Sequence, residues 1–210
     1  MSRRQDDLNT TSFAMLGMLA IRPWSTYELA KHLDRSLRPL WPRARSHLFK
    51  EPKKLVDHGL ADASKETVGR RPRTVYAITP KGRQALRSWL AQPGEGPSLE
   101  FEQLLKVFFA DQSSKSDALR AVGNIRMWAE ERNAENVAVA RAYVAGDGPF
   151  PERAQVLNVV GRFLTEFADM VRDWADWADK TIQAWPEDVQ RAEPDWEWMQ
   201  KVADRDPRPS

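Results

Sequence analysis

Three arginines fall within four consecutive positions of a segment whose other residues favour a β-hairpin. The segment spans residues 59–82, and its second half is rich in the β-branched and aromatic residues typical of a returning strand. Gly69 and Pro72 are expected to interrupt the strand pairing at the tip. Guanidinium groups pair well with phosphate oxygens, so cations on an exposed loop predict contact with a polyanion. The expected loop carries Arg70, Arg71 and Arg73.

A second group of polar side chains follows Pro42, which can occupy the first turn of a helix without losing a hydrogen bond. Leu48 and Leu55 would lie on the side of such a helix that faces the core of the domain. Pro52 removes a backbone donor and is expected to kink or stop the helix, leaving its first two turns to read DNA. The outward side chains that we expect to contact base edges and phosphates are Arg43, Arg45, Ser46, His47 and Lys50.

The elements that must position these two groups are also indicated by the sequence. Polar residues 9–12 offer caps for an apolar helix that ends at Arg22, and this helix is expected to be central or packed against a second subunit. Ser25 and Glu28 have the spacing of a capping box, which begins a second helix. Another helix should start at Thr79 and Pro80 and run to Gln92. Helix, hairpin and helix in this order predict a winged helix-turn-helix, and DNA binding is the leading hypothesis.

Charge divides the chain into two parts. Residues 1–92 contain 18 Lys or Arg against 8 Asp or Glu, and residues 93–210 contain 14 against 22, giving net charges of +10 and −8. Glycines and prolines between residues 92 and 98 favour a domain boundary there. We therefore predict a winged helix-turn-helix DNA-binding domain over residues 1–92 and a second domain over residues 93–210.

The second part is expected to be helical throughout. Ser98 should cap a short helix, Ser114 or Ser116 a long one reaching about Tyr143, and a further long helix should begin at Pro151. Apolar residues recur at spacings of three and four along this last helix to Trp185. A dimer accounts for two such helices, although an intramolecular hairpin could bury part of the stripe. The predicted fold is mainly α with a small β-hairpin wing, followed by an antiparallel helical dimerisation and effector-sensing domain.

Six of the nine tryptophans lie in the acidic part. They favour a large aromatic core, and an alternative is an aromatic effector pocket formed by Trp128, Trp174 and Trp177. Asp173, Asp176 and Asp179 are expected to form the solvated side of a helix rather than a metal site.

Several classes of function find no support in the sequence. The chain has no cysteine and only three histidines, none near a nucleophile, phosphate-loop or dinucleotide motif, so we predict no enzyme, no metal and no cofactor. The apolar run between Phe13 and Ile21 is too short to span a bilayer, which favours a cytoplasmic protein without a membrane partner.

The residues from Trp41 to Gly82 resemble the PadR family of bacterial transcriptional regulators, with the pattern Tyr-x-Ile-Thr-x-x-Gly at the junction of strand and helix. The sequence departs from the family at Phe49, where tyrosine is common, and at Pro52, where leucine is commoner. The resemblance implies a homodimeric repressor that binds an inverted-repeat operator in double-stranded DNA and senses a small aromatic or apolar ligand. A non-DNA helical adaptor is the alternative; an enzyme is less favoured.

Overall fold

The computed structural model describes residues 8–33, 37, 40–41, 50–68 and 71–206, without the side chains of Val68 and Arg71. The chain divides into two compact units, Met1–Pro97 and Ser98–Ser210. We call them unit 1 and unit 2. In the described part of the chain, no helix has both the length and the apolarity required to cross a membrane.

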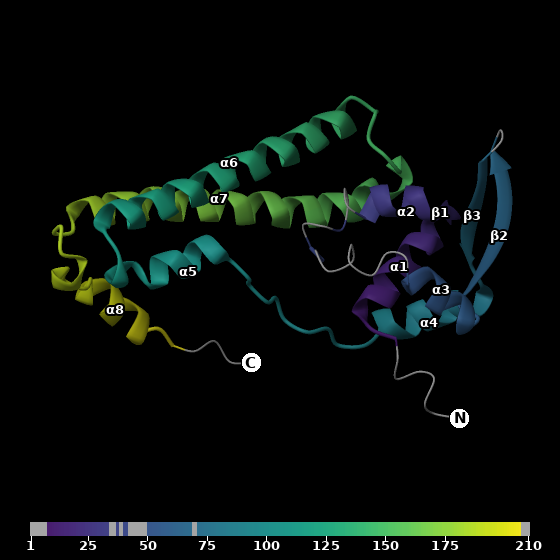
Figure 1. Ribbon diagram of the computed structural model, residues 1–210, viewed down its shortest axis with the longest axis horizontal. Coiled ribbons are helices and arrows are strands. Elements are labelled where there is room, and N and C mark those ends of the chain that lie inside the picture. Colours follow the sequence, from purple (N-terminus) through teal and green to yellow (C-terminus); the bar gives the residue numbers. More distant parts are fainter. Residues whose placement is uncertain (1–7, 34–36, 38–39, 42–49, 69–70, 207–210) are drawn as a thin grey trace. The chain divides into compact units, whose positions relative to one another are not determined.

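Unit 1 joins short helices to a three-stranded antiparallel sheet with strand order β1-β3-β2 (Figure 1). Strands β2 and β3 form the predicted hairpin, and two residues of β1 pair with Val75 and Tyr76 on the other side of β3. The elements are α1 (Thr10–Ile21), β1 (Trp24–Ser25), α2 (Thr26–His32), α3 (Glu51–Asp57), β2 (Ala61–Val68), β3 (Arg71–Ile78) and α4 (Pro80–Leu90).

The helices of unit 1 begin where the sequence places capping residues. The Asn9 side chain accepts a hydrogen bond from the backbone of Ser12, and Ser25 and Glu28 form a reciprocal capping box. Thr79 caps α4 by accepting from the backbone of Gly82. These predicted starts are confirmed.

Helix α1 lies at the centre of unit 1. Met15, Leu16 and Leu19 are almost fully buried, and the indole of the buried Trp24 donates to the Met18 carbonyl at 2.7 Å. On α2 the Tyr27 side chain is 77% exposed, whereas Leu29 and the C-cap residue Leu33 are buried.

The wing and α3 differ from expectation at two prolines. Pro72 lies within β3 opposite Thr67, so the pairing continues to Val68 and Arg71 instead of ending at Pro72. Proline is tolerated there because β1 pairs only with Val75 and Tyr76, which leaves β3 with one neighbour at Pro72. Pro52 lies in the first turn of α3, where its missing amide costs no hydrogen bond.

Unit 2 is helical, and its two long helices, α6 and α7, pack against each other as an antiparallel hairpin (Figure 1). The helices are α5 (Glu102–Phe108), α6 (Lys115–Val144), α7 (Ala154–Ala184) and α8 (Trp196–Ala203), with 3-10 turns at Ala110–Gln112, Pro151–Arg153 and Val189–Arg191. The mainly α fold with a small β-hairpin is thus confirmed.

The ends of these helices test the cap predictions. Ser114 forms a capping box with Asp117, and hydrogen bonds from Ser113 and Ser114 lower the pKa of the Asp117 carboxyl to about 2. Gly146, with φ of +81°, follows the end of α6. The prediction for Ser98 is wrong, because α5 begins only at Glu102 and Phe101 occupies the cap position without a side-chain hydrogen bond.

The core of unit 2 occupies only part of the hairpin. Buried residues of α6 fall between Ala118 and Ala129, and those of α7 fall between Ala168 and Ile182. Beyond these stretches the two helices separate towards their connection (Figure 1). Apolar residues near the connection therefore remain exposed, including Val144 at 91% and Val159 at 72%.

Candidate nucleic-acid interface

Most of the predicted DNA-contacting side chains lie outside the described residues. These are Arg43, Arg45, Ser46, His47 and Arg70, together with the side chain of Arg71, whose backbone begins β3. Lys50 and Arg73 are described. Lys50 is exposed immediately before α3, as expected for a cation available to phosphate.

Trp41, just before positions 42–49, and Glu51, two residues after them, are both anchored on the first turn of α1. The Trp41 indole donates to Thr11 Oγ1 at 2.9 Å, and Ser12 Oγ donates to Glu51 Oε2 at 2.6 Å. Thr11, Ser12 and Glu51 are all buried. Two consecutive residues of α1 thus fix the points where the chain enters and leaves the predicted reading segment. No pattern in the sequence pointed to these two contacts.

Arg73 occupies a different environment from the one predicted. It lies within β3 directly opposite Glu66 of β2, not on the hairpin loop. Its Nε and Nη2 atoms lie 3.2 and 2.9 Å from Glu66 Oε2, and its Nη1 atom lies 3.8 Å from Glu28 Oε2. The expectation of a loop cation is wrong because β3 extends to Arg71, which places Arg73 inside the ladder.

Glu28 connects this pair to the start of α2. The Ser25 hydroxyl donates to it at 2.7 Å and the Ser25 amide at 2.9 Å. These hydrogen bonds, with smaller contributions from the positive charges of Arg22 and Arg73, lower the pKa of Glu28. Arg22 also places its guanidinium carbon 3.7 Å from the centre of the Trp24 ring. Two arginines and two glutamates thus form a charge-balanced group between the start of α2 and the tip-side half of the wing.

A sequence signal for this group exists. Glu66 and Arg73 are each three residues from the two-residue tip at positions 69 and 70, so any hairpin with that tip places them opposite each other. Lys65 precedes Glu66 on β2, and its exposed side chain makes no ion pair with a described residue. It adds a cation to the wing that the sequence reasoning did not single out.

The three tryptophans of the predicted effector pocket do not share one environment. Trp128 lies with its ring centre 5.5 Å from Phe101 and 6.4 Å from Phe167, and with Trp174 it packs on the core of unit 2. Trp177 is 54% exposed and does not join that core. A groove of about 540 Å³ lies elsewhere, between α5 and α6, and its lining includes Leu105, Phe109 and Arg120 but no tryptophan among the described residues.

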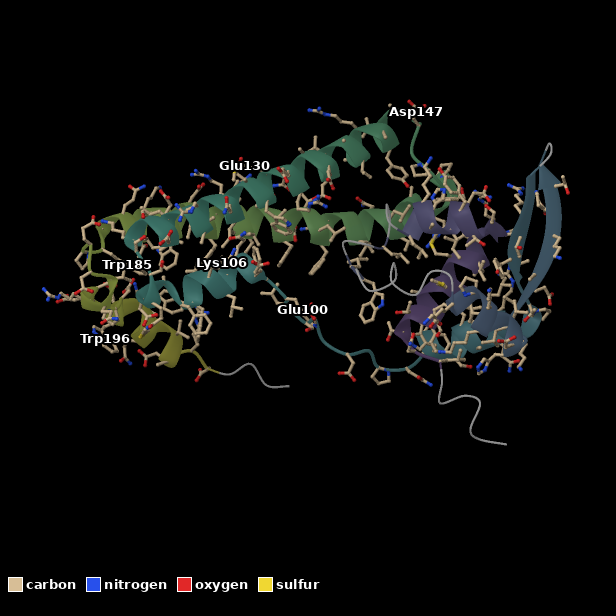
Figure 2. The ribbon with its side chains drawn as sticks, viewed as in Figure 1. Glu100, Lys106, Glu130, Asp147, Trp185 and Trp196 are labelled. Carbon is tan, nitrogen blue, oxygen red and sulfur yellow. The ribbon has the colours of Figure 1, made fainter. Side chains whose placement is uncertain are left out.

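Trp185, nearer the carboxyl terminus, packs on the same core as Trp128 and Trp174. Figure 2 shows Trp185, just after α7, and Trp196, at the start of α8, at the same end of unit 2. The Lys115 ammonium donates to the Trp185 carbonyl at 2.7 Å and so joins the two ends of the hairpin. Among the described residues, no three His, Cys, Asp or Glu side chains are grouped so that they could hold a metal ion.

Comparisons with known proteins match both units. The model of the PadR-like family of transcriptional regulators matches residues 15–88, and the model of the virulence activator alpha carboxy-terminal domain matches residues 102–183. A Mycobacterium tuberculosis protein described as a probable transcriptional regulator, Rv1176c, is 32% identical over 83 residues. The match covers 38% of this chain and 43% of that relative, so the chain spans less than half the relative's length.

Solved structures share the fold. Bacillus subtilis PadR in complex with operator DNA superposes with a TM-score of 0.73 at 20% identity, over 83% of this chain and 99% of that one. The same protein with p-coumaric acid gives a TM-score of 0.66 at 19% identity and the same coverage. The Vibrio cholerae virulence activator AphA gives 0.62 at 21% identity, again over 83% and 99%.

Proposed function

We propose that this protein is a homodimeric repressor that binds an inverted-repeat operator in double-stranded DNA, because the model of the PadR-like family of transcriptional regulators matches residues 15–88. The observation that carries the proposal is the coincidence of that family match with a winged unit of net positive charge. Chromosomal DNA as the target implies action in the cytoplasm. The family is one of regulators and not of enzymes.

In this proposal the predicted reading segment enters the major groove. Arg43, Arg45, Ser46 and His47 contact base edges and phosphates, and Lys50 contacts the backbone. Arg70 and Arg71 at the tip of the wing contact phosphates or the minor groove. The hydrogen bonds that anchor Trp41 and Glu51 on buried residues of α1 support this proposal, because they hold the described residues on both sides of the segment against unit 1.

We propose that unit 2 joins the two subunits. On α7 a second apolar stripe lies apart from the face buried against α6, and its members are Val159, Phe163, Met170 and Trp177, each more than half exposed. Phe163, Met170 and Trp177 follow one another at spacings of seven, which is the repeat of a helix-packing seam. Two heads related by a twofold axis would bind inverted half-sites about 34 Å apart.

We further propose that a small aromatic ligand releases the DNA. Bacillus subtilis PadR has been solved with p-coumaric acid, and the ring contacts among Phe101, Trp128 and Phe167 supply aromatic surface of the same chemical kind in unit 2. Trp174 packs beside them, whereas Trp177 belongs to the exposed stripe. The ligand would act by binding one arrangement of unit 2 more tightly than another.

Fluorescence anisotropy with a duplex from the promoter of the protein's own gene tests the central proposal. We expect binding that weakens steeply with salt and that falls when Arg70 and Arg71 are both changed to alanine, with a lower salt slope. Exposed Arg87 of α4, changed to alanine, is the matched control. If neither this duplex nor other promoter fragments bind at low salt, a non-DNA adaptor becomes the better reading.

A further inference from the structure

The guanidinium group of Arg73 has a glutamate on two of its sides, Glu66 and Glu28. Nε and Nη2 donate to one carboxylate oxygen of Glu66, and Nη1 faces Glu28 at 3.8 Å. Both members of the pair are nearly half exposed, with side-chain exposures of 42% for Arg73 and 45% for Glu66. The pair therefore lies where a polyanion approaching the wing would meet it.

We propose that Glu66 sets the DNA affinity of the wing by keeping Arg73 paired within the protein. This inference rests on the proposed DNA binding. It reverses the expected role of Arg73: in the complex the guanidinium stays with Glu66, and the phosphate contacts of the wing come from other cations. Glu66 then limits the affinity of the wing for DNA, and Arg73 acts only through its pairing with Glu66.

The physical reason is the charge left behind if the pair opens. A guanidinium that moves to a phosphate gives up two hydrogen bonds to Glu66 and leaves that carboxylate unpaired beside a polyanion. Moving the guanidinium from Glu66 to a phosphate replaces one charge-assisted contact by another and adds repulsion between the Glu66 carboxylate and the phosphates. The register of the hairpin also opposes it, because Glu66 and Arg73 are directly cross-strand neighbours.

Replacing the glutamate removes the first obstacle, the carboxylate charge, and leaves the hairpin register unchanged. In Glu66→Gln the guanidinium loses its anionic partner on β2 and can turn to a phosphate. One more phosphate contact steepens the fall of log affinity with log salt by about 0.9 and corresponds to roughly a fivefold to tenfold gain near 0.1 M salt. Fluorescence anisotropy titrations of the full-length protein at several salt concentrations measure both quantities.

Two further variants separate release of the arginine from a simple change in charge. Asp62→Asn adds the same unit of charge on the same face of β2, but Asp62 makes no ion pair with a described residue, so we expect a gain below about twofold. The double variant Glu66→Gln with Arg73→Gln keeps the net charge of the parent protein. We expect its affinity to lie within about twofold of the parent, with an unchanged salt slope.

Two outcomes overturn the inference while leaving DNA binding intact. A fivefold to tenfold loss in the double variant, with a slope lower by about one, means that Arg73 already contacts phosphate. An equal gain for Glu66→Gln and Asp62→Asn means that only net charge matters. The pair itself is tested without DNA by the ¹⁵Nε–Hε NMR signal of Arg73, expected to shift in Glu66→Gln and to stay in place in Asp62→Asn. If the parent protein binds no DNA, the proposed function fails while this signal still reports on the pair.

Discussion

Ser12 is a residue whose single hydroxyl serves two contacts in a buried position. Its Oγ atom donates to Glu51 at 2.6 Å and accepts from the backbone N–H of Asn9 at 3.1 Å, and the residue is 1% exposed. Without the hydroxyl, the buried Glu51 carboxylate would keep Lys54, 3.8 Å away, as its ion-pair partner. The contact therefore stabilises both the start of α1 and the first turn of α3.

We expect Ser12→Ala to lower the free energy of unfolding by about 2–3 kcal/mol, because a buried carboxylate loses a hydrogen-bond donor. Chemical denaturation followed by circular dichroism measures the change. Ser88→Ala, at an exposed position of α4, is the control and should change stability by less than about 0.5 kcal/mol. Equal stability of the two variants would show that the buried contact contributes nothing.

For single residues, the sequence predicts helix caps better than it predicts the partners of charged side chains. Ser25 with Glu28, Thr79 and Ser114 were found because a cap depends on residues close together in the chain. The partner of Arg73 depends on which residues face each other across a hairpin. Because β3 begins at Arg71, this arginine lies in the strand pairing and not on the loop.

At the scale of elements, the junction between β3 and α4 depends on Gly82. A Cβ atom at this position would overlap the Leu60 carbonyl oxygen and lie 2.9 Å from Ile78 Cγ1. That carbonyl already accepts from the Thr79 amide at 3.0 Å, so it cannot move away without loss. The close approach of α4 to the start of β2 therefore requires glycine.

We expect Gly82→Ala to destabilise the protein by more than about 2 kcal/mol, because the methyl group meets backbone and not a flexible side chain. Gly123→Ala is the matched control: it lies inside α6 with no neighbouring heavy atom within 4 Å of the added Cβ. Alanine there should raise stability by about 0.5–1 kcal/mol, since glycine is unfavourable in helix interiors. Thermal unfolding that moves both variants in the same direction would contradict this account.

Element prediction succeeded where periodicity was long and failed where it was short. The two long helices of unit 2 followed from apolar spacing over many turns, and the structure places them over Lys115–Val144 and Ala154–Ala184. Helix α8 was missed, because eight residues give too little periodicity and none of them is buried. The late start of α5 at Glu102 shows that a serine before an apolar run need not be a cap.

At the scale of the whole molecule, the apolar stripe predicted on α7 divides into two. Val171, Ala178 and Ile182 are buried in the hairpin, as the intramolecular alternative required. Val156 and Phe163, which precede them among the apolar residues of α7, are 48% and 59% exposed. The hairpin thus accounts for only part of the apolar surface, and apolar side chains left outside are typical of a subunit interface.

This division leads to a prediction about assembly. Met170 lies in the middle of the exposed stripe and is 54% exposed, so Met170→Glu should leave the subunit folded while placing an unpaired charge inside the proposed interface. We expect the dimer dissociation constant to rise by roughly 100-fold or more, which corresponds to about 3 kcal/mol. Leu90→Glu on α4, 66% exposed in unit 1, is the control and should leave the dimer intact. Sedimentation velocity measures the assembly state.

DNA affinity of the Met170 variant should fall with dimerisation, because two coupled heads bind an inverted repeat far more tightly than one. A variant that sediments as a dimer at all concentrations would move the interface away from this face of α7.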